Sequence, residues 1–201
     1  MGTVIRNGTV VTADLTYKAD VLVEGGVITA IGPGLSGDTV LDATGCYVMP
    51  GGIDPHTHMQ LPFGGTSASD TFETGTRAAA WGGTTSIIDF AVQRTGERIE
   101  DGLAHWHELA AGNCAIDYGF HQIVGGVDEH SLAALPGLID EGITSFKMFM
   151  AYPGVFYSDD AQILKAMQVS AETGLLTMMH AENGPAIDVL AAQLVEQRKT
   201  D

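Results

Sequence analysis

The hydrophobic pattern of the chain changes near residue 48. Up to that point, short β-branched runs alternate with glycine-containing pairs, as in VIRNGTVVT and VLVEGGVITAIG. Asn7-Gly8 and Gly25-Gly26 suit the positive φ angles that two-residue hairpin turns require. This pattern predicts a small antiparallel β module over residues 1–48.

From Tyr47 onward, continuous apolar runs alternate with helix-like stretches. The apolar runs cover residues 47–54, 84–92, 116–124, 144–150 and 175–181. The helix-like stretches cover residues 69–81, 97–111, 128–142, 158–174 and 185–199, and Pro136 weakens the third of them. Strands that helices cover on both faces appear as continuous apolar runs, so this alternation predicts parallel βαβ units of the α/β class.

Polar residues recur near the predicted carboxyl ends of these strands. They are His56, Asp89, His121, Lys147 and His180, and neighbouring members are 26 to 33 residues apart, the length of one βα unit. In a β/α barrel the carboxyl ends of the strands surround one mouth, where active sites lie. The spacing therefore predicts that residues distant in sequence meet around one point.

The first of these polar positions belongs to an HxH motif. His56 and His58 lie one residue apart in PGGIDPHTHMQLPFGGT, directly after an apolar run. Successive side chains of an extended segment point to opposite faces, so both imidazoles share a face and Thr57 turns away. Imidazoles that converge at a strand end suit a metal ion. For the motif taken alone, a hydrogen-bonded pair of loop histidines is the alternative.

Lys147 lies within ITSFKMFMAY, among apolar residues of a predicted buried strand. A buried ammonium group is costly unless it is paired or loses its charge. The side chain either reaches a carboxylate at the strand end or becomes a neutral amine that captures carbon dioxide as a carbamate. A carbamate is anionic and can bridge two metal ions. His180 in LLTMMHAEN could then bind the second metal, whereas alone it is equally a hydrogen-bonded strand-end histidine.

Composition and charge narrow the class of protein. The 201-residue chain is 45% hydrophobic and 17% charged, as in soluble globular proteins, and its net charge of −16 argues against nucleic acid or an anionic membrane as a partner. No apolar run approaches the roughly 18 to 20 residues of a membrane span, and the N-terminus lacks a signal-peptide pattern. Cys46 and Cys114 form no CxxC motif, so we expect no disulfide framework and a cytoplasmic location.

Four stretches together resemble the hydantoinase/dihydropyrimidinase family of amidohydrolases. They are GGIDPHTHMQLPFGGT, AAWGGTTSIIDFAV, SFKMFMAYPGVF and MMHAENG. The resemblance implies an N-terminal β-sandwich over residues 1–48 and the first part of a (β/α)₈ barrel over residues 49–201. It also implies a two-metal centre, usually zinc, that hydrolyses a cyclic amide, either a dihydropyrimidine or a 5-substituted hydantoin, to an N-carbamoyl amino acid.

The same resemblance implies the ligands of the two metals. His56 and His58 would bind the first metal, Lys147 would bridge both as a carbamate, and His180 would bind the second. His121 is interpreted as a supporting group and not as a ligand. Asp54 lies two residues before His56 and is interpreted as orienting a neighbouring group.

The resemblance also assigns the substrate pocket. Tyr152 matches the tyrosine whose hydroxyl stabilises the oxyanion of the tetrahedral intermediate. Leu61, Phe63 and Phe156 match loop positions that shape the pocket for the exocyclic group of the substrate. LPFGGT and AYPGVFY are also suited to line a pocket because they are apolar, aromatic and rich in glycine.

The chain departs from the family pattern at its C-terminus. It supplies five βα units, and the family's histidine after strand six and aspartate after strand eight have no counterpart; neither Asp54 nor Asp89 matches that aspartate. We therefore expect an incomplete portion of a longer enzyme, with weak metal binding and little activity by itself. The family implies a homo-oligomer, a tetramer or dimer, for the full-length protein.

Three other functions stay open at this point. An allantoinase shares the expected metal ligands, although the aromatic loop around Tyr152 and Phe156 favours a hydantoinase. A dihydroorotase typically carries an arginine shortly after HxH, where this chain has Met59-Gln60-Leu61. A non-catalytic scaffold related to dihydropyrimidinase, or a chain that acts only as an assembly partner, is the remaining alternative.

Overall fold

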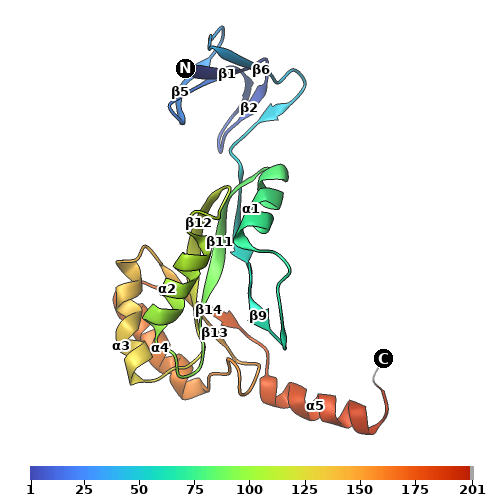
Figure 1. The fold of residues 1–201 in the computed structure, drawn as a ribbon, viewed down its shortest axis with the longest axis vertical. Coiled ribbons are helices and arrows are strands. Elements are labelled where there is room, and N and C mark those ends of the chain that lie inside the picture. The colour runs from blue at the N-terminus through green and yellow to red at the C-terminus, as the bar shows by residue number, and fades with distance from the viewer. Residues whose placement is uncertain (200–201) are drawn as a thin grey trace. The chain divides into compact units, whose positions relative to one another are not determined.

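The computed structural model describes residues 1–199, which divide into two compact units, one over residues 1–51 and one from Gly52 onward (Figure 1). The boundary lies within the run 47–54, for which the hydrophobic pattern predicts a single strand. Tyr47–Val48 (β7) belongs to the first unit, and Gly52–Thr57 (β8) begins the sheet of the second. Each unit is therefore described by itself.

The first unit contains a four-stranded sheet and a three-stranded sheet. The four-stranded sheet has the order β5-β4-β1-β6 and consists of Gly2–Arg6 (β1), Asp20–Glu24 (β4), Val27–Gly32 (β5) and Thr39–Asp42 (β6). The other has the order β3-β2-β7 and adds Thr9–Val11 (β2) and Thr16–Lys18 (β3). β1 pairs with β6, and β2 with β7, in parallel. The prediction of a purely antiparallel module is wrong for these two pairs.

The two glycine-containing pairs differ in what they connect. Gly25 and Gly26 have φ angles of 58° and 82° and join the antiparallel strands β4 and β5, as predicted for a hairpin. Asn7-Gly8 instead joins β1 to β2, which lie in different sheets, so the hairpin predicted there is wrong. A Cβ atom on Gly8 would lie 2.4 Å from Val48 Cγ2. Gly8 thus permits a close tertiary contact.

Asp20 holds three segments of the first unit together. Its carboxylate accepts hydrogen bonds from the backbone N–H groups of Asn7, Gly34 and Leu35, at 3.1, 2.9 and 3.1 Å. The bond from Asn7 is the largest influence that lowers the pKa of this carboxyl below its ordinary value. The ionised form therefore stabilises the folded unit.

We expect Asp20→Asn to lower the thermal stability of the first unit by a few degrees at neutral pH, because an amide keeps only one acceptor oxygen. The folded-state pKa is depressed, so this stabilisation exists above the ordinary pKa and disappears as the pH falls through the lowered value. The measurement follows the amide NMR signals of residues 1–51 on heating, once at neutral pH and once at an acid pH at which the Asp20 carboxyl is protonated. The exposed Asp14→Asn is the control, and an equal loss at acid pH would contradict the prediction.

The second unit is built on one parallel sheet with the order β14-β13-β12-β11-β8. Besides β8, its strands are Thr84–Gln93 (β11), Asp117–Val124 (β12), Ser145–Phe149 (β13) and Leu176–His180 (β14). All four neighbouring pairs are parallel. Spatial order therefore follows chain order, as in one half of a β/α barrel, and the prediction of successive parallel βα units is confirmed.

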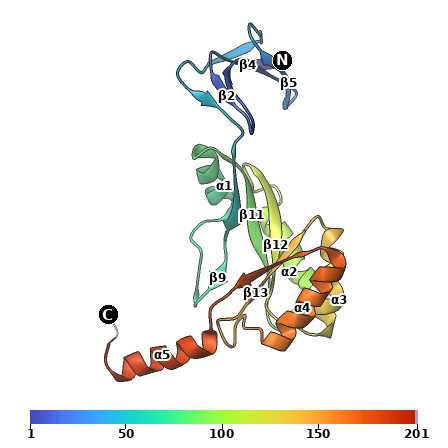
Figure 2. The same cartoon turned by 180° about the vertical axis from the view of Figure 1, so that it is seen from behind.

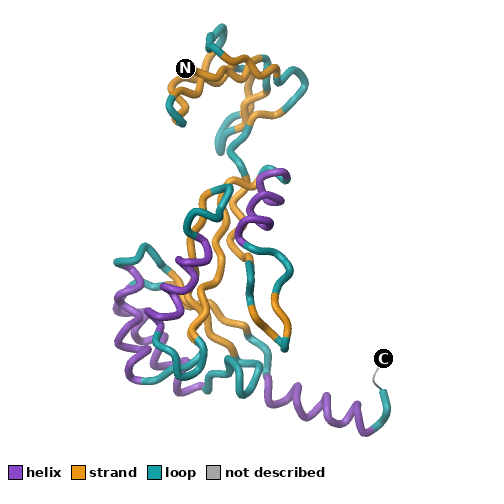
Figure 3. Tube along the Cα trace, in the orientation of Figure 1, coloured by secondary structure: helices purple, strands orange, loops and turns teal. Residues whose placement is uncertain are grey.

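A helix follows each strand of this sheet (Figure 3). The helices are Phe72–Trp81 (α1), Ile99–Ala110 (α2), Glu129–Ala134 (α3), Asp160–Thr173 (α4) and Gly184–Glu196 (α5). Figures 1 and 2 show α2, α3 and α4 on one side of the strands, whereas α5 runs away from the sheet. At Pro136 the predicted third helix changes into a 3₁₀ segment, Leu135–Ile139 (η1), because proline lacks the N–H of an α-helical bond.

The helix ends follow local chemistry. Asp159 and Gln162 form a capping box at the start of α4, and Gly174, with φ of 79°, ends this helix in the left-handed conformation. The core lies between the sheet and its helices and contains Phe72, Phe90, Phe146 and Met148, which are fully buried. In residues 1–199, no helix is long and apolar enough to cross a membrane.

Candidate metal and substrate site

A cavity of about 290 Å³ lies at the carboxyl ends of the parallel strands. The lining residues are His56, His58, Leu61, Phe63, Ile123, Lys147, Phe149, Tyr152, Phe156 and His180. All eight residues that the sequence singles out for metal or substrate are among them. Ile123 and Phe149 are the two that sequence reasoning missed, and both lie on predicted strands close to the carboxyl end.

The two histidines of the HxH motif face the cavity together. His56 lies in β8 and His58 directly after it, and their ring centroids are 5.2 Å apart. Both rings pack on Phe90, with centroid distances of 4.7 and 4.9 Å. Thr57 turns the other way and donates a hydrogen bond of 2.9 Å to Asp89. The alternation of side chains along an extended strand therefore produces the arrangement that the motif predicts.

Lys147 lies at the centre of β13, a strand with every residue buried. Its Nζ atom is 3.4 Å from His56 Nε2 and lies over the rings of Phe90 and Phe149, 4.5 and 5.2 Å from their centroids. Within residues 1–199, no carboxylate pairs with this amine at salt-bridge distance. Burial lowers the pKa of Lys147, so the neutral amine forms more readily than in an exposed lysine.

The HxH imidazoles are neutral at physiological pH. Burial, followed by the nearby charge of Lys147, lowers the pKa of His58 to about 4, and the same two causes lower the pKa of His56. His58 Nδ1 is buried and has no hydrogen-bond partner among the described residues. A neutral imidazole with a free buried nitrogen is the form that binds a divalent cation. The donor chemistry therefore fits a metal ion.

His180 closes the opposite side of the cavity, at the end of β14. Its ring stacks on Phe149 at 5.5 Å and lies 5.2 Å from that of Tyr152, and its Nε2 is 2.8 Å from Glu182 Oε2. Among residues 1–199, no three His, Cys, Asp or Glu side chains are grouped as metal ligands. The group next to the HxH pair is instead a lysine, which becomes a ligand only when it is neutral or carboxylated.

Tyr152 has a strained backbone. Its φ angle is 61°, in the left-handed region that a bulky residue rarely occupies, at a cost on the order of 1–3 kcal/mol. Its carbonyl accepts hydrogen bonds from the N–H groups of Val155, Phe156 and Tyr157, which form a tight turn. This turn directs the Tyr152 ring into the cavity, 5.1 Å from the ring of Phe63.

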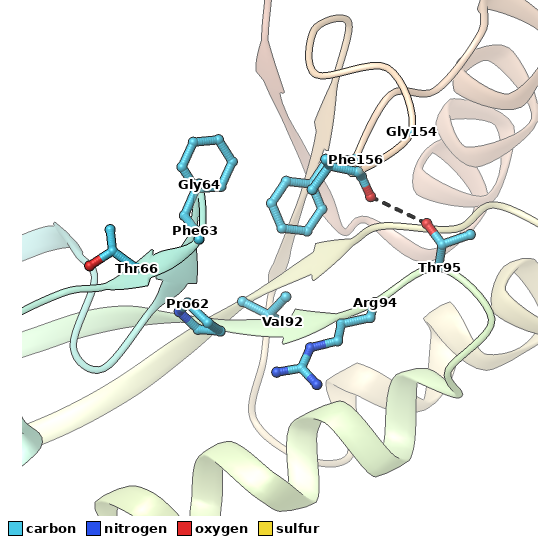
Figure 4. Close-up of a pocket in the computed structure, with 11 residues that line it drawn as sticks. Pro62, Phe63, Gly64, Thr66, Val92, Arg94, Thr95, Gly154 and Phe156 are labelled. Carbon is cyan, nitrogen blue, oxygen red and sulfur yellow. Dashed lines mark hydrogen bonds between the residues drawn. The ribbon is translucent and has the colours of Figure 1, made fainter.

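A second hollow of about 560 Å³ adjoins this cavity and shares Phe63 and Phe156 with it (Figure 4). The rings of these two residues are nearly parallel, with centroids 6.2 Å apart. Arg94 and Thr95 also line the hollow, and Thr95 Oγ1 donates a hydrogen bond of 3.2 Å to the Val155 carbonyl. Sequence reasoning missed both, although their place directly after β11 was an available signal.

Two further predicted residues lie beside the cavity. His121 is hydrogen-bonded through its ring nitrogens to Ser145 Oγ and, at 3.0 Å, to the carbonyl of Pro55, and it does not line the cavity. It connects β8, β12 and β13. The Asp54 carboxylate accepts a hydrogen bond of 3.1 Å from the backbone N–H of His56.

Comparison with known proteins agrees with this fold. Residues 47–198 match the amidohydrolase family, and the chain belongs to this family. It is 58% identical to a D-hydantoinase of Streptomyces coelicolor and 50% identical to one of Geobacillus stearothermophilus, across 99% and 100% of its length. The crystal structure of a dihydropyrimidinase from Brevibacillus agri superposes on the whole chain with a TM-score of 0.95 at 50% identity.

These relatives are longer than the chain. The chain spans 44% of the Streptomyces coelicolor protein, 43% of the Geobacillus stearothermophilus protein and 44% of the Brevibacillus agri structure. The resemblance to hydantoinases and dihydropyrimidinases that the motifs indicate is confirmed over the entire chain.

Proposed function

We propose that this chain contributes the HxH, lysine and tyrosine part of the active site of a cyclic-amide hydrolase. The reaction opens the ring amide of a 5-substituted hydantoin or a dihydropyrimidine and yields an N-carbamoyl amino acid. The names of its relatives support this reaction class. The single observation that carries the proposal is that one cavity collects His56, His58, Lys147, Tyr152 and His180 from three separate stretches of the chain.

Two divalent cations, by preference zinc, are part of the proposal. His56 and His58 would hold the first, Lys147 as a carbamate would bridge both, and His180 would hold the second. The carbamate forms when the neutral amine of Lys147 attacks carbon dioxide, makes an N–C bond and loses one proton to solvent. When bound, the cations supply Lewis-acid activation of a water molecule and of the ring carbonyl.

The remaining chemistry uses side chains of this chain. The Tyr152 hydroxyl donates a hydrogen bond to the carbonyl oxygen as negative charge grows on it, and the strained backbone holds this donor in place before the reaction. Leu61, Phe63 and Phe156 form the apolar wall that receives the exocyclic group and excludes water. No carboxylate is among the described residues that line the cavity, so we assign delivery of the proton to the leaving nitrogen to none of them.

A chimeric enzyme tests the proposal. Residues 1–201 replace the matching part of the Streptomyces coelicolor D-hydantoinase, and the purified protein is assayed with zinc for hydrolysis of hydantoin and dihydrouracil. We expect ring opening of at least one substrate, detected as the N-carbamoyl product. A folded chimera that binds zinc but opens neither ring, beside an active parent, would refute the proposal.

In this chimera we expect Tyr152→Phe to lower kcat by a factor of about 10² to 10³ without changing zinc content, because one oxyanion donor is lost. The ring and the backbone turn remain, so folding is unaffected. Steady-state kinetics and metal analysis are the measurements. Tyr157→Phe removes a hydroxyl from the same turn outside the cavity and should leave kcat unchanged. A loss of zinc in the Tyr152 variant would contradict the assigned role.

A further inference from the structure

Asp89, near the middle of β11, is a fully buried carboxylate that lies outside the cavity lining. It accepts four hydrogen bonds. The donors are Thr57 Oγ1 at 2.9 Å, Met59 N at 2.8 Å, Phe90 N at 2.8 Å and Trp106 Nε1 at 3.1 Å. Burial of a carboxylate is costly, and this set of donors offsets the cost.

The two oxygens of the Asp89 carboxylate accept hydrogen bonds from different parts of the chain. Oδ2 accepts from Thr57 and from the backbone of Met59, the residues directly before and after His58. Oδ1 accepts from the indole of Trp106 in α2 and from the backbone of Phe90. Oδ2 therefore brackets His58, while Oδ1 anchors the carboxylate to α2 and to the backbone of its own strand, β11.

The two bonds to Oδ2 lie at the end of β8, where regular strand pairing stops. β8 ends at Thr57, so His58 lies beyond its ladder. The register between β8 and β11 is also irregular at this end, between Ile87 and Asp89. The bonds to Asp89 hold the Thr57 side chain and the Met59 backbone, on the two sides of His58.

We propose that Asp89 is a positioning residue that holds His58, and with it the HxH pair, in the orientation that binds a divalent cation. The proposal rests on the metal site of the proposed function and adds a residue to it. An amide in place of the carboxylate has one acceptor oxygen and two donor hydrogens, so it cannot bracket His58 and bind Trp106 in the same way. The loop after β8 would then be free to leave its ligand geometry.

Cobalt titration of the 201-residue chain, in the presence of bicarbonate and followed by visible absorption, tests this role. We expect Asp89→Asn to weaken Co²⁺ binding by about 10- to 100-fold, as for other groups that orient metal ligands. Circular dichroism of each variant, at a temperature well below its unfolding midpoint, establishes that the variants compared are folded.

Thr57→Val is the second variant and keeps the test valid if Asp89→Asn fails to fold. It removes one bond to Oδ2 and nothing from the cavity lining, and we expect about tenfold weaker Co²⁺ binding. Ser131→Ala is the matched control, because it also removes one hydrogen-bonded hydroxyl. Ser131 is buried in α3, and its hydroxyl donates to the Gly126 carbonyl and accepts from the Gln93 side chain. Its Co²⁺ affinity should equal that of the unchanged chain.

The outcomes separate the two proposals. Co²⁺ affinity that is unchanged in folded Asp89→Asn and Thr57→Val would overturn the positioning role and leave the metal site intact. Equal losses in Thr57→Val and Ser131→Ala would also overturn it, because they would show a general effect of lost stability. An unchanged chain that binds no Co²⁺ would overturn the metal site itself, and the positioning role with it.

Discussion

Lys147→Ala is expected to weaken binding of divalent cations by the chain at least 100-fold. The amine lies 3.4 Å from His56 Nε2, and its carbamate would be the one anionic ligand among the proposed groups. Without it, two cations would have only neutral imidazoles as ligands, and nothing would offset the repulsion between them. Metal content of the purified protein and Co²⁺ titration measure the loss.

Two comparisons make this result specific. Lys165→Ala removes an exposed lysine from α4 and should leave metal binding unchanged. Addition of formate or acetate should partly restore binding to the Lys147 variant, because a small carboxylate can occupy the space of the carbamate. In the chimera, hydrolysis should fall to background and recover in the same way. Full metal content without an added carboxylate would exclude the carbamate role.

Phe90→Ala is expected to lower the free energy of unfolding of the second unit by about 3–5 kcal/mol. Phe90 is fully buried in β11, and its ring supports the rings of His56, His58 and His121 at centroid distances of 4.7, 4.9 and 4.8 Å. Its removal leaves a cavity in the core and takes away the surface on which the histidines rest. Co²⁺ affinity should therefore fall together with stability.

Urea unfolding followed by tryptophan fluorescence measures this change. Both tryptophans lie in the second unit, and buried Trp106 becomes exposed on unfolding, whereas Trp81 is 93% exposed in the folded protein. Phe63→Ala is the control, because Phe63 is 39% exposed in the short strand Pro62–Phe63 (β9) and its loss leaves no core cavity. We expect a loss below about 1 kcal/mol for the control. Equal losses in the two variants would contradict the supporting role of Phe90.

Local periodicity accounts for the parts of the site that could be predicted. The alternation of strand side chains places His56 and His58 on one face of β8. The regular βα spacing brings Lys147 and His180 to the carboxyl ends of neighbouring parallel strands. The positions of Tyr152, Leu61, Phe63 and Phe156 came from family resemblance. Periodicity alone does not report which loop residues turn inward.

Other features could not be predicted from local patterns. Asp89 was identified as a strand-end polar residue, but three of its four donors, Thr57, Met59 and Trp106, lie 17 to 32 residues away in the sequence. Arg94 and Thr95 directly follow β11, which places them at the carboxyl end of the sheet, but only the folded chain shows that they line a hollow. The positive φ angle of Tyr152 could not be predicted either, because a tyrosine, unlike a glycine, does not indicate a left-handed backbone conformation.

Local patterns are enough to predict the alternation of strands and helices after residue 48, the turn at Gly25-Gly26 and the shared face of the HxH pair, because each depends on neighbours within a few residues. Three features appear only in the folded chain: Asn7-Gly8 joins two different sheets, Lys147 lies between an imidazole and two aromatic rings, and one oxygen of Asp89 brackets His58. Apart from Phe149, which is two residues from Lys147, these contacts connect residues 30 to 91 positions apart, or strands in separate sheets. Their geometry is set by packing, which no local pattern records.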